Sequence, residues 1–251
     1  MKIIDISCFY GPWAAYPVKG DIAEVAAELR RFGITCGLIS PLATVWCRNP
    51  QAYNRELLEV TRPHSGLMPV PALDPSIPTW REEVETMRRD TRVVAFRVFL
   101  NYTRFDLGRR DTLDDFFGYF NQIGVPLIIQ RRMEDPRYNH HKAVVADADV
   151  NYLQETAMRF PELKLILGGM SAGVNAARAL AHAGIYLDTA QMDSMACIRR
   201  QIDAGLLPRL LFGTHVPLFE TYAAFGRVLH DVSDSEAEQI LYGNAARLFG
   251  L

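Results

Sequence analysis

The sequence of 251 residues contains few cysteines: Cys8, Cys36, Cys47 and Cys197 are widely spaced, and no two form a CxxC pair. This spacing argues against a disulfide framework and against a thiolate zinc site, because both need clustered cysteines. The sequence also lacks an excess of charge of either sign, since 27 Lys and Arg residues are balanced by 29 Asp and Glu residues. A net charge of −2 gives no electrostatic footprint for nucleic acid or an anionic membrane surface.

Long hydrophobic runs are lacking too. No apolar run approaches the roughly 18 residues that cross a bilayer, and no basic segment followed by an apolar stretch indicates an export signal. Together with the scattered cysteines, these features predict a soluble cytoplasmic protein with no nucleic-acid partner and no membrane partner. No linker rich in Gly and Ser divides the chain, so we expect residues 1–251 to form one domain.

Short apolar runs rich in β-branched residues are abundant. Eight of them recur along the chain: KIIDIS, TCGLIS, LMPVPAL, VVAFRVFL, PLIIQ, KLILGG, IYLDTA and LLFGTH. Most are continuously hydrophobic, which is typical of parallel strands covered on both faces. Segments with helical periodicity lie between them, and we predict helices over residues 21–33, 112–124, 147–161, 175–184 and 233–250.

This repetition of strand and helix predicts an α/β fold, a single (β/α)8 TIM barrel closed by right-handed parallel crossovers. The longest irregular stretches follow strand ends, at residues 10–20, 42–50, 101–111 and 131–148. We expect them to be extended loops on the C-terminal face, where ligands bind in such barrels. The main alternative, a doubly wound sheet, normally has a Gly-rich phosphate turn after its first strand, and SCFYGPW is not one.

Five stretches resemble one known family: IIDISCFYGPW, RFPELKLILGGMSAG, IYLDTA, LLFGTHVPLF and ILYGNAARLFGL. They resemble the amidohydrolase-related family, in the branch of metal-dependent hydrolases that includes aminocarboxymuconate-semialdehyde decarboxylase-like enzymes. The resemblance extends from the first strand to the last helix. It implies a (β/α)8 barrel with one or two divalent ions at the C-terminal ends of the strands, and it makes a homodimer plausible.

The positions that would bind metal in this family carry other residues. The resemblance places the two histidines of the first strand at Ser7 and Phe9, and those of the fifth and sixth strands at Gln130 and, within one residue, Gly169. The aspartate of the eighth strand falls at His215. Zinc needs about four N, O or S ligands, and only His215 is a good one. We therefore expect no divalent metal, no other cofactor, and loss of metal-dependent hydrolysis.

A relocated metal site is an alternative. The loop after the fifth strand contains Glu134, His140 and His141, which could form an N/O site together with His215. Adjacent histidines rarely point at one ion, however, and a charged loop of this kind is usually solvated.

Arginines near strand ends suggest an anion site. Alternation in the fourth strand places Arg97 on the face opposite its two neighbours, so it could line the lumen and bind a carboxylate or phosphate bidentately. One of Arg131 and Arg132 is also expected to face inward. For Arg97, the alternative is a structural ion pair with one of three carboxylates: Asp5, Glu134 or Asp188.

Two further polar residues are candidates for catalysis. His215 ends the eighth strand and could act as a general base, with Gln130 polarising a carbonyl, although a histidine with only a structural role fits equally well. Ser7 is expected to face the mouth with no activated base beside it. Cys8 is expected to face the helical layer, which argues against a thiolate nucleophile.

Aromatic residues in the same loops could form the apolar walls of a pocket, or could be lids that pack on one another: Phe9, Tyr10, Trp13, Trp46, Tyr102 and Phe105. Our first hypothesis is a protein that binds a small anionic molecule, a carboxylate or lactone, through Ser7, Phe9, Trp13, Arg97, Tyr102 and Arg132. The second is a metal-independent hydrolase, lactonase or decarboxylase with His215 as base. The third is a hydrolase with a relocated metal.

Overall fold

The structure is a computed structural model that describes residues 1–103, 110–135, 137, 144–148, 150, 152–170, 177, 180, 183–230 and 232–251, with only the backbone at 110–112. Its strands are β1 (Ile4–Tyr10), β2 (Cys36–Pro41), β3 (Leu67–Pro69), β4 (Ala72–Leu73), β5 (Phe96–Val98), β6 (Leu127–Gln130), β7 (Leu165–Gly168), β8 (Tyr186–Asp188) and β9 (Leu210–Leu211). Its helices are α1 (Ile22–Arg31), α2 (Ala43–Trp46), α3 (Gln51–Thr61), α4 (Trp80–Met87), α5 (Arg110–Ile123), α6 (Tyr152–Arg159), α8 (Cys197–Asp203), η2 (Leu207–Arg209), α9 (Thr221–Leu229), α10 (Asp234–Glu238), η3 (Gln239–Gly243) and α11 (Asn244–Phe249).

Neighbouring strands are parallel and follow chain order, from β1 to β3 and from β4 to β9. β3 and β4 are two halves of the third barrel strand, which we predicted to be continuous over residues 67–73. Pro69 and Pro71 interrupt it, because proline has no N–H to donate to a neighbouring strand. Val70 between them still donates its N–H to the carbonyl of Ile39, 2.8 Å away, so the two halves follow one path.

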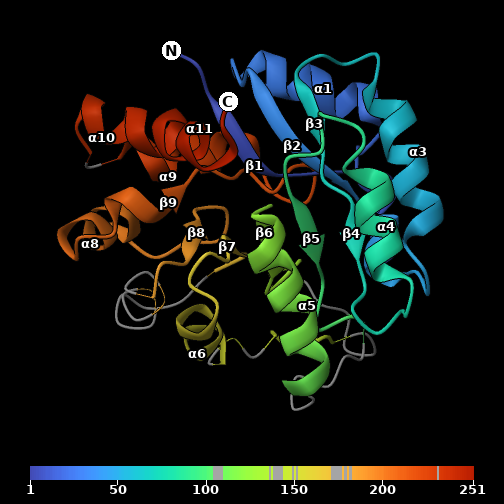
Figure 1. The fold of residues 1–251 in the computed structure, drawn as a ribbon. Coiled ribbons are helices and arrows are strands. Elements are labelled where there is room, and N and C mark those ends of the chain that lie inside the picture. The colour runs from blue at the N-terminus through green and yellow to red at the C-terminus, as the bar shows by residue number, and fades with distance from the viewer. Residues whose placement is uncertain are drawn as a thin grey trace.

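Backbone hydrogen bonds between the last strand and the first close the barrel. The N–H of Ile6 donates to the carbonyl of Phe212 at 3.0 Å, and the N–H of His215 donates to the carbonyl of Ser7 at 2.8 Å. With β3 and β4 counted as one strand, the ring has eight strands, with helices outside it (Figure 1). The predicted (β/α)8 barrel is confirmed.

At the N-terminal end of the strands the barrel lumen is apolar, and helix α11 covers this end. Ala245 and Leu248 of α11 are buried among lumen side chains from most of the strands: Ile4, Ile6, Leu38, Val70, Ala95, Ile128, Ile166 and Leu211. Figure 1 shows α11 beside β1, so the two ends of the sequence meet at this end of the barrel. The polar chemistry of the lumen is therefore confined to the opposite, C-terminal end.

Most predicted helices are present. Residues 21–33, 147–161 and 233–250 contain α1, α6 and the α10–α11 region, in which η3 is a π-helical turn. Helix α5 begins two residues before the predicted range 112–124. The helix predicted over 175–184 lies outside the described residues, apart from isolated positions. Helices α3, α8 and α9 were not predicted, and α2 lies in a stretch expected to be irregular. None of the described helices is long and apolar enough to cross a membrane.

Candidate functional site

A β-bulge in β1 sets the directions of the side chains at the barrel mouth. β1 pairs with β2 at Asp5 and again at Cys8, but β2 advances by only two residues over this interval, from Gly37 to Ile39. After the bulge, Cys8 points outward into the helix-facing core and Phe9 points inward to the mouth, both fully buried. The outward direction predicted for Cys8 is confirmed.

Arg97 of β5 lies inside the barrel. Its strand neighbours Phe96 and Val98 belong to the helix-facing core, as the alternation predicted. Its Nη2 donates to the carbonyl of Ile6, in the β1 bulge, at 2.8 Å, and its guanidinium carbon lies 4.4 Å from the centroid of the Phe9 ring. The bulge thus supplies both an acceptor and an aromatic face for this cation.

Arg97 forms no close ion pair with a described carboxylate, although the charges of Asp188 and Asp5 act on it at longer range. Its Nε and Nη1 are buried and have no hydrogen-bond partner in the part of the chain that the structure describes. No described carboxylate oxygen lies within 4.0 Å, so an ion pair with Asp5, Glu134 or Asp188 is not formed. Burial lowers the pKa of Arg97 to about 10, which still leaves it protonated at neutral pH.

The two buried aspartates hold backbone N–H groups. Asp5 accepts from the N–H of Ser7 at 2.9 Å and of Thr214 at 3.1 Å. Asp188 accepts through Oδ1 from the N–H of Gly169 at 3.1 Å and of Ala190 at 3.3 Å, while its buried Oδ2 has no partner among the described residues. Burial raises the pKa of Asp188 to about 6. These carboxylates fix the strand ends around the lumen.

His215 is neutral and forms a hydrogen-bonded pair with Ser7. Its Nε2 lies 2.8 Å from the carbonyl oxygen of Met133, which can only accept, so Nε2 carries the proton. The unprotonated Nδ1 lies 3.3 Å from the hydroxyl of Ser7, which therefore donates to it. Burial lowers the pKa of His215 to about 3. The expectation that no base lies beside Ser7 is wrong, because the bulge and the left-handed backbone of His215 (φ 65°) bring the two together.

Residues Arg132–Glu134, which we call the mouth segment, cross the open end of the barrel. The amide of Gln130 donates to the carbonyl of Arg132 at 2.8 Å, His215 donates to Met133, and the indole of Trp13 donates to Glu134. The Met133 side chain is buried in the apolar cluster at the mouth. Beneath it lies what we call the inner layer, in which no side chain is more than 1% exposed: Ser7, Phe9, Arg97, Gln130, Asp188 and His215.

The predicted aromatic wall lies at the rim and packs on itself. The rings of Trp13 and Trp46 are 6.0 Å apart, and Tyr102 meets Trp46 edge to face at 4.8 Å. Phe105 lies outside the described residues. Burial raises the pKa of Tyr102, so its hydroxyl stays protonated. This arrangement matches the alternative in which these rings are lids, and ligand binding by Trp13 and Tyr102 stays a prediction.

Neither arginine after β6 enters the inner layer. Arg131 lies 3.0 Å from Asp147, and Arg132 donates through Nε to the same carboxylate at 2.7 Å. We expected one of the two to face inward. Instead the shared carboxylate holds both guanidinium groups beside the mouth, outside the lumen.

A hollow of about 260 Å³, the outer pocket, lies beside the mouth. The loops after β6, β8 and β9 and helix α9 line it, through Arg132, Asp135, Arg137, Ala190, Gln191, Asp193, Phe219, Glu220, Ala223 and Arg227. The Phe219 ring lies 5.1 Å from the ring of His215, so it stands between the pocket and the inner layer. Of the predicted ligand residues, the outer pocket contains Arg132. Sequence reasoning missed Arg227.

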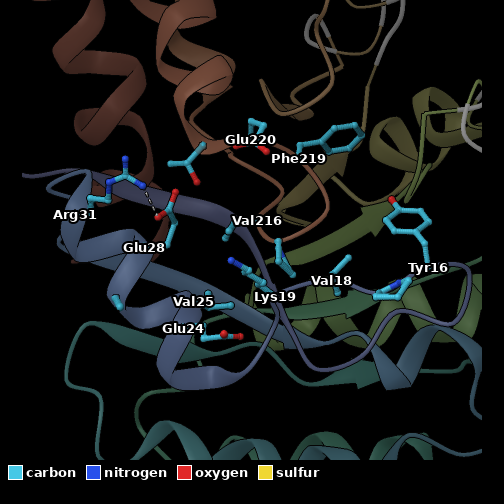
Figure 2. Close-up of a pocket in the computed structure, with 14 residues that line it drawn as sticks. Tyr16, Val18, Lys19, Glu24, Val25, Glu28, Arg31, Val216, Phe219 and Glu220 are labelled. Atoms are coloured by element: carbon cyan, nitrogen blue, oxygen red, sulfur yellow. Dashed lines mark hydrogen bonds and ion pairs between the residues drawn. The ribbon is translucent and has the colours of Figure 1, made fainter.

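A larger groove of about 750 Å³ lies on the other side of Phe219 and Glu220, and we call it the α1 groove. Figure 2 shows α1 on one side of it, with Glu28 paired to Arg31 at 3.5 Å, and the loop after β9 on the other. Its lining includes both cations and anions, and Lys19 lies in the middle of the residues drawn (Figure 2).

The residues present do not fit the divalent metal that the resemblance implies. Phe9 and Gly169 offer no side-chain donor, and both nitrogens of His215 are hydrogen-bonded. In the relocated site, Glu134 accepts from Trp13, while His140 and His141 lie outside the described residues. Among the residues that are described, no group of three or more His, Cys, Asp and Glu side chains could hold a metal ion.

Comparison with protein families gives one match that covers nearly the whole chain. The amidohydrolase family matches residues 7–251, so the chain belongs to the amidohydrolase family. None of the curated proteins compared with the chain matches it significantly.

Solved structures show the same fold. A 2,6-dihydroxybenzoate decarboxylase from Rhizobium has 17% identity and a TM-score of 0.74, over 100% of this chain and 99% of its own. A dihydroxybenzoic acid decarboxylase from Polaromonas sp. JS666, with bound manganese and the inhibitor 2-nitroresorcinol, has 16% identity and a TM-score of 0.70. The match covers 100% of this chain and 97% of that one. A probable 2-pyrone-4,6-dicarboxylic acid hydrolase from Acinetobacter baumannii, with bound citric acid, has 14% identity and a TM-score of 0.65. The match covers 100% of both chains. Metal use therefore occurs in proteins of this fold.

Proposed function

We propose that this amidohydrolase-family barrel has lost metal-dependent hydrolysis and binds a small carboxylate at its C-terminal face. The observation that carries the proposal is the inner layer, where Phe9 stacks on the buried guanidinium of Arg97 beside a His215 that has no free nitrogen. A divalent cation about 5 Å from a guanidinium is repelled by roughly 7 kcal/mol at an effective dielectric constant of about 20. The carboxylate of Asp188 offsets part of this repulsion. The buried cation beside Phe9, a position where the resemblance puts a metal ligand, therefore supports the loss of the metal.

Two arginines and the structural neighbours support the second part of the proposal, the binding of a small carboxylate. Arg132 and Arg227 line a hollow at the face where TIM barrels bind ligands, and guanidinium groups bind carboxylates bidentately. Two of the similar structures are named as decarboxylases of dihydroxybenzoates, and a third contains citric acid. Aromatic and aliphatic carboxylates are therefore the first ligands to test on this chain.

Elemental analysis tests the loss of metal. Protein purified without chelator should contain far less than one divalent ion per chain, and added Mn²⁺ or Zn²⁺ should neither raise the melting temperature nor support hydrolysis. A stoichiometric ion that survives gel filtration would contradict the proposal.

Thermal melting tests the binding. At millimolar concentration, 2,6-dihydroxybenzoate, benzoate or citrate should raise the melting temperature, because a ligand that binds only the folded chain stabilises it by mass action. The matching neutral amides should have no effect. If no carboxylate shifts the melting temperature, the proposed binding function is wrong.

A second candidate function follows from the Ser7–His215 pair. The neutral imidazole can accept a proton through Nδ1 from the Ser7 hydroxyl, and its tautomer is fixed by Met133. Such a pair suits metal-free opening of a lactone or decarboxylation. Substrate would reach it only after the mouth segment moves, since both side chains are fully buried.

Turnover of small lactones and unsaturated keto acids tests this second function. We expect activity that falls by at least 100-fold in both Ser7→Ala and His215→Asn, as is typical of losing a nucleophile or a general base. Activity that is insensitive to both substitutions would remove the mechanism.

A further inference from the structure

Arg227 brings a guanidinium with unused bonding capacity into the outer pocket. Through Nη1 it donates to the carbonyl oxygens of Thr189 at 3.1 Å and Ala190 at 2.9 Å, which fixes it at the C-terminal end of β8. Its Nε and Nη2 donate to no described residue, and no described carboxylate oxygen lies within 4.0 Å. The guanidinium is therefore positioned by neutral carbonyls and not neutralised by an anion.

The floor of the outer pocket contributes further donors. Gln191 is 6% exposed and lines the pocket beside Arg132. Arg132 contacts the carboxylate of Asp147, which Arg131 also contacts, so this carboxylate is not devoted to Arg132 alone. An anion on the floor would thus be attracted from two sides.

The exposed rim of the outer pocket carries both signs of charge. The Asp193 side chain is 63% exposed and lies 4.0 Å from Arg137, and the exposed Glu220 adds a second carboxylate. A dianion such as phosphate would be repelled more strongly by Glu220 than a monocarboxylate whose single charge lies on the floor. The Phe219 ring forms one wall, which suits an apolar body attached to that carboxylate.

We propose that the outer pocket is the carboxylate site of this protein, with Arg227 binding the ligand carboxylate and with Arg132 and Gln191 beside it. The ligand class is a small organic monocarboxylate with an apolar body. This inference rests on the proposed function, which assigns carboxylate binding to the C-terminal face without assigning the pocket.

Calorimetric titration of the full chain with benzoate tests the site. Arg227→Met should weaken benzoate binding at least 10-fold. The matched control Arg31→Met removes an arginine from the α1 groove, where it pairs with Glu28, and should leave the affinity unchanged. Arg97→Met is the discriminating variant, since weaker benzoate binding in this variant alone would place the ligand in the inner layer and overturn the assignment to the outer pocket.

A second variant keeps the test valid if Arg227→Met does not fold. Ala223 is exposed, lies in the first turn of α9 and lines the pocket, so Ala223→Glu adds a negative charge there without changing buried packing. We expect a loss of at least 10-fold in benzoate affinity with an unchanged circular dichroism spectrum. Benzamide should not bind, and inorganic phosphate should bind more weakly than benzoate.

Failure of this inference can be told apart from failure of the proposed function. If benzoate binds the wild type and both pocket variants equally, or if only Arg97→Met weakens it, the outer pocket is not the site, although carboxylate binding stands. If phosphate binds more tightly than benzoate, the assigned ligand class is wrong. If no carboxylate binds the wild type, the proposed function itself fails.

Discussion

The guanidinium carbon of Arg97 lies 4.4 Å from the centroid of the Phe9 ring, and both side chains are completely buried. The ring covers the cation on one side, while the carbonyl of Ile6 accepts one of its N–H groups. Stacking on an aromatic face offsets part of the desolvation cost of a buried charge. Phe9 therefore does more than fill the mouth, because it shields a cation that has no described carboxylate within ion-pair distance.

Substitution of Phe9 should reveal this shielding. Phe9→Ala should lower the free energy of unfolding by about 3–5 kcal/mol, because it leaves a void above Arg97. Phe9→Leu keeps most of the apolar volume but loses the aromatic face, which is worth up to about 2 kcal/mol at a desolvated site. Urea denaturation measures both values.

Phe120→Leu is the matched control for Phe9→Leu, because Phe120 is also fully buried but packs against Phe96 and Phe116 and no cation. Phe9→Leu should lower the free energy of unfolding by more than Phe120→Leu does. Equal costs would mean that the contact with Arg97 contributes nothing to stability.

Strand number and the direction of Arg97 could be predicted from the sequence. Continuous apolar runs identified all eight barrel strands, and alternation in β5 placed Arg97 on the lumen face. These signals are readable because they depend on side-chain type and on a fixed period of two residues along a strand. The interruption of the third strand could also be predicted from the sequence, because Pro69 and Pro71 have no N–H to donate to a neighbouring strand.

The contacts that close the inner layer could not be predicted in the same way. Arg97 binds the carbonyl of Ile6, and His215 binds that of Met133, and a backbone carbonyl leaves no mark in the residue type. The bulge in β1 and the left-handed backbone of His215 change which way the nearby side chains point. The periodicity of the sequence alone does not reveal this change. The pairing of Ser7 with His215 was missed for this reason.

Arg227 was missed because α9 was not predicted. A partial signal existed, since the last strand of a (β/α)8 barrel must be followed by a helix, and residues 221–229 follow β9. Arg227 lies in the last turn of that helix and not at its start, so this rule alone does not bring it to the C-terminal face. Which carbonyls hold it and which pocket it lines depend on the loops after β6 and β8, and the sequence does not specify their paths.

Asp147 competes with a ligand for Arg132, and Asp147→Asn should expose this competition. The substitution removes the negative charge that Arg132 contacts, so it should lower the free energy of unfolding by about 1–3 kcal/mol while raising benzoate affinity several-fold. Urea denaturation and calorimetric titration give the two readouts. A purely structural role for Asp147 would leave the affinity unchanged or lower.

Asp114→Asn is the control for that substitution. Asp114 binds Arg159 through two hydrogen bonds, at 2.8 and 2.6 Å, but this pair is partly exposed and lies outside the outer pocket. We expect a stability loss of at most about 1 kcal/mol, as for other surface ion pairs, and no change in benzoate affinity.

Two glycine substitutions should have opposite effects on stability. At Gly213 an added Cβ would lie 2.8 Å from the Cβ of Ser7 and 3.3 Å from that of Ala190, so Gly213→Ala should cost about 1–3 kcal/mol by overpacking the strand ends. At Gly226, in the exposed middle of α9, a Cβ meets nothing within 4 Å, so Gly226→Ala should stabilise by about 0.5–1 kcal/mol. Urea denaturation compares them, and a neutral Gly213→Ala would show that the bulge around Ser7 relaxes freely.

The buried His215 should make stability depend on pH. Its pKa is held at about 3, whereas an unfolded histidine titrates near pH 6.5. Between these values the unfolded state binds more protons, so the free energy of unfolding should fall as the pH decreases through this range. The titration of His215 alone should lower the free energy of unfolding by roughly 2.5 kcal/mol when the pH falls from 7 to 4.5.

Asp188 acts in the opposite direction, and one variant separates the two. Because its pKa is raised to about 6, the folded state binds more protons between about pH 4 and 6, and this contribution to stability grows as the pH falls. His215→Asn retains Asp188, and asparagine tolerates the left-handed backbone at this position. The difference in unfolding free energy between wild type and His215→Asn should therefore shift by roughly 2.5 kcal/mol against the wild type from pH 7 to pH 4.5. A difference that stays constant with pH would mean that His215 titrates normally and is not buried as described.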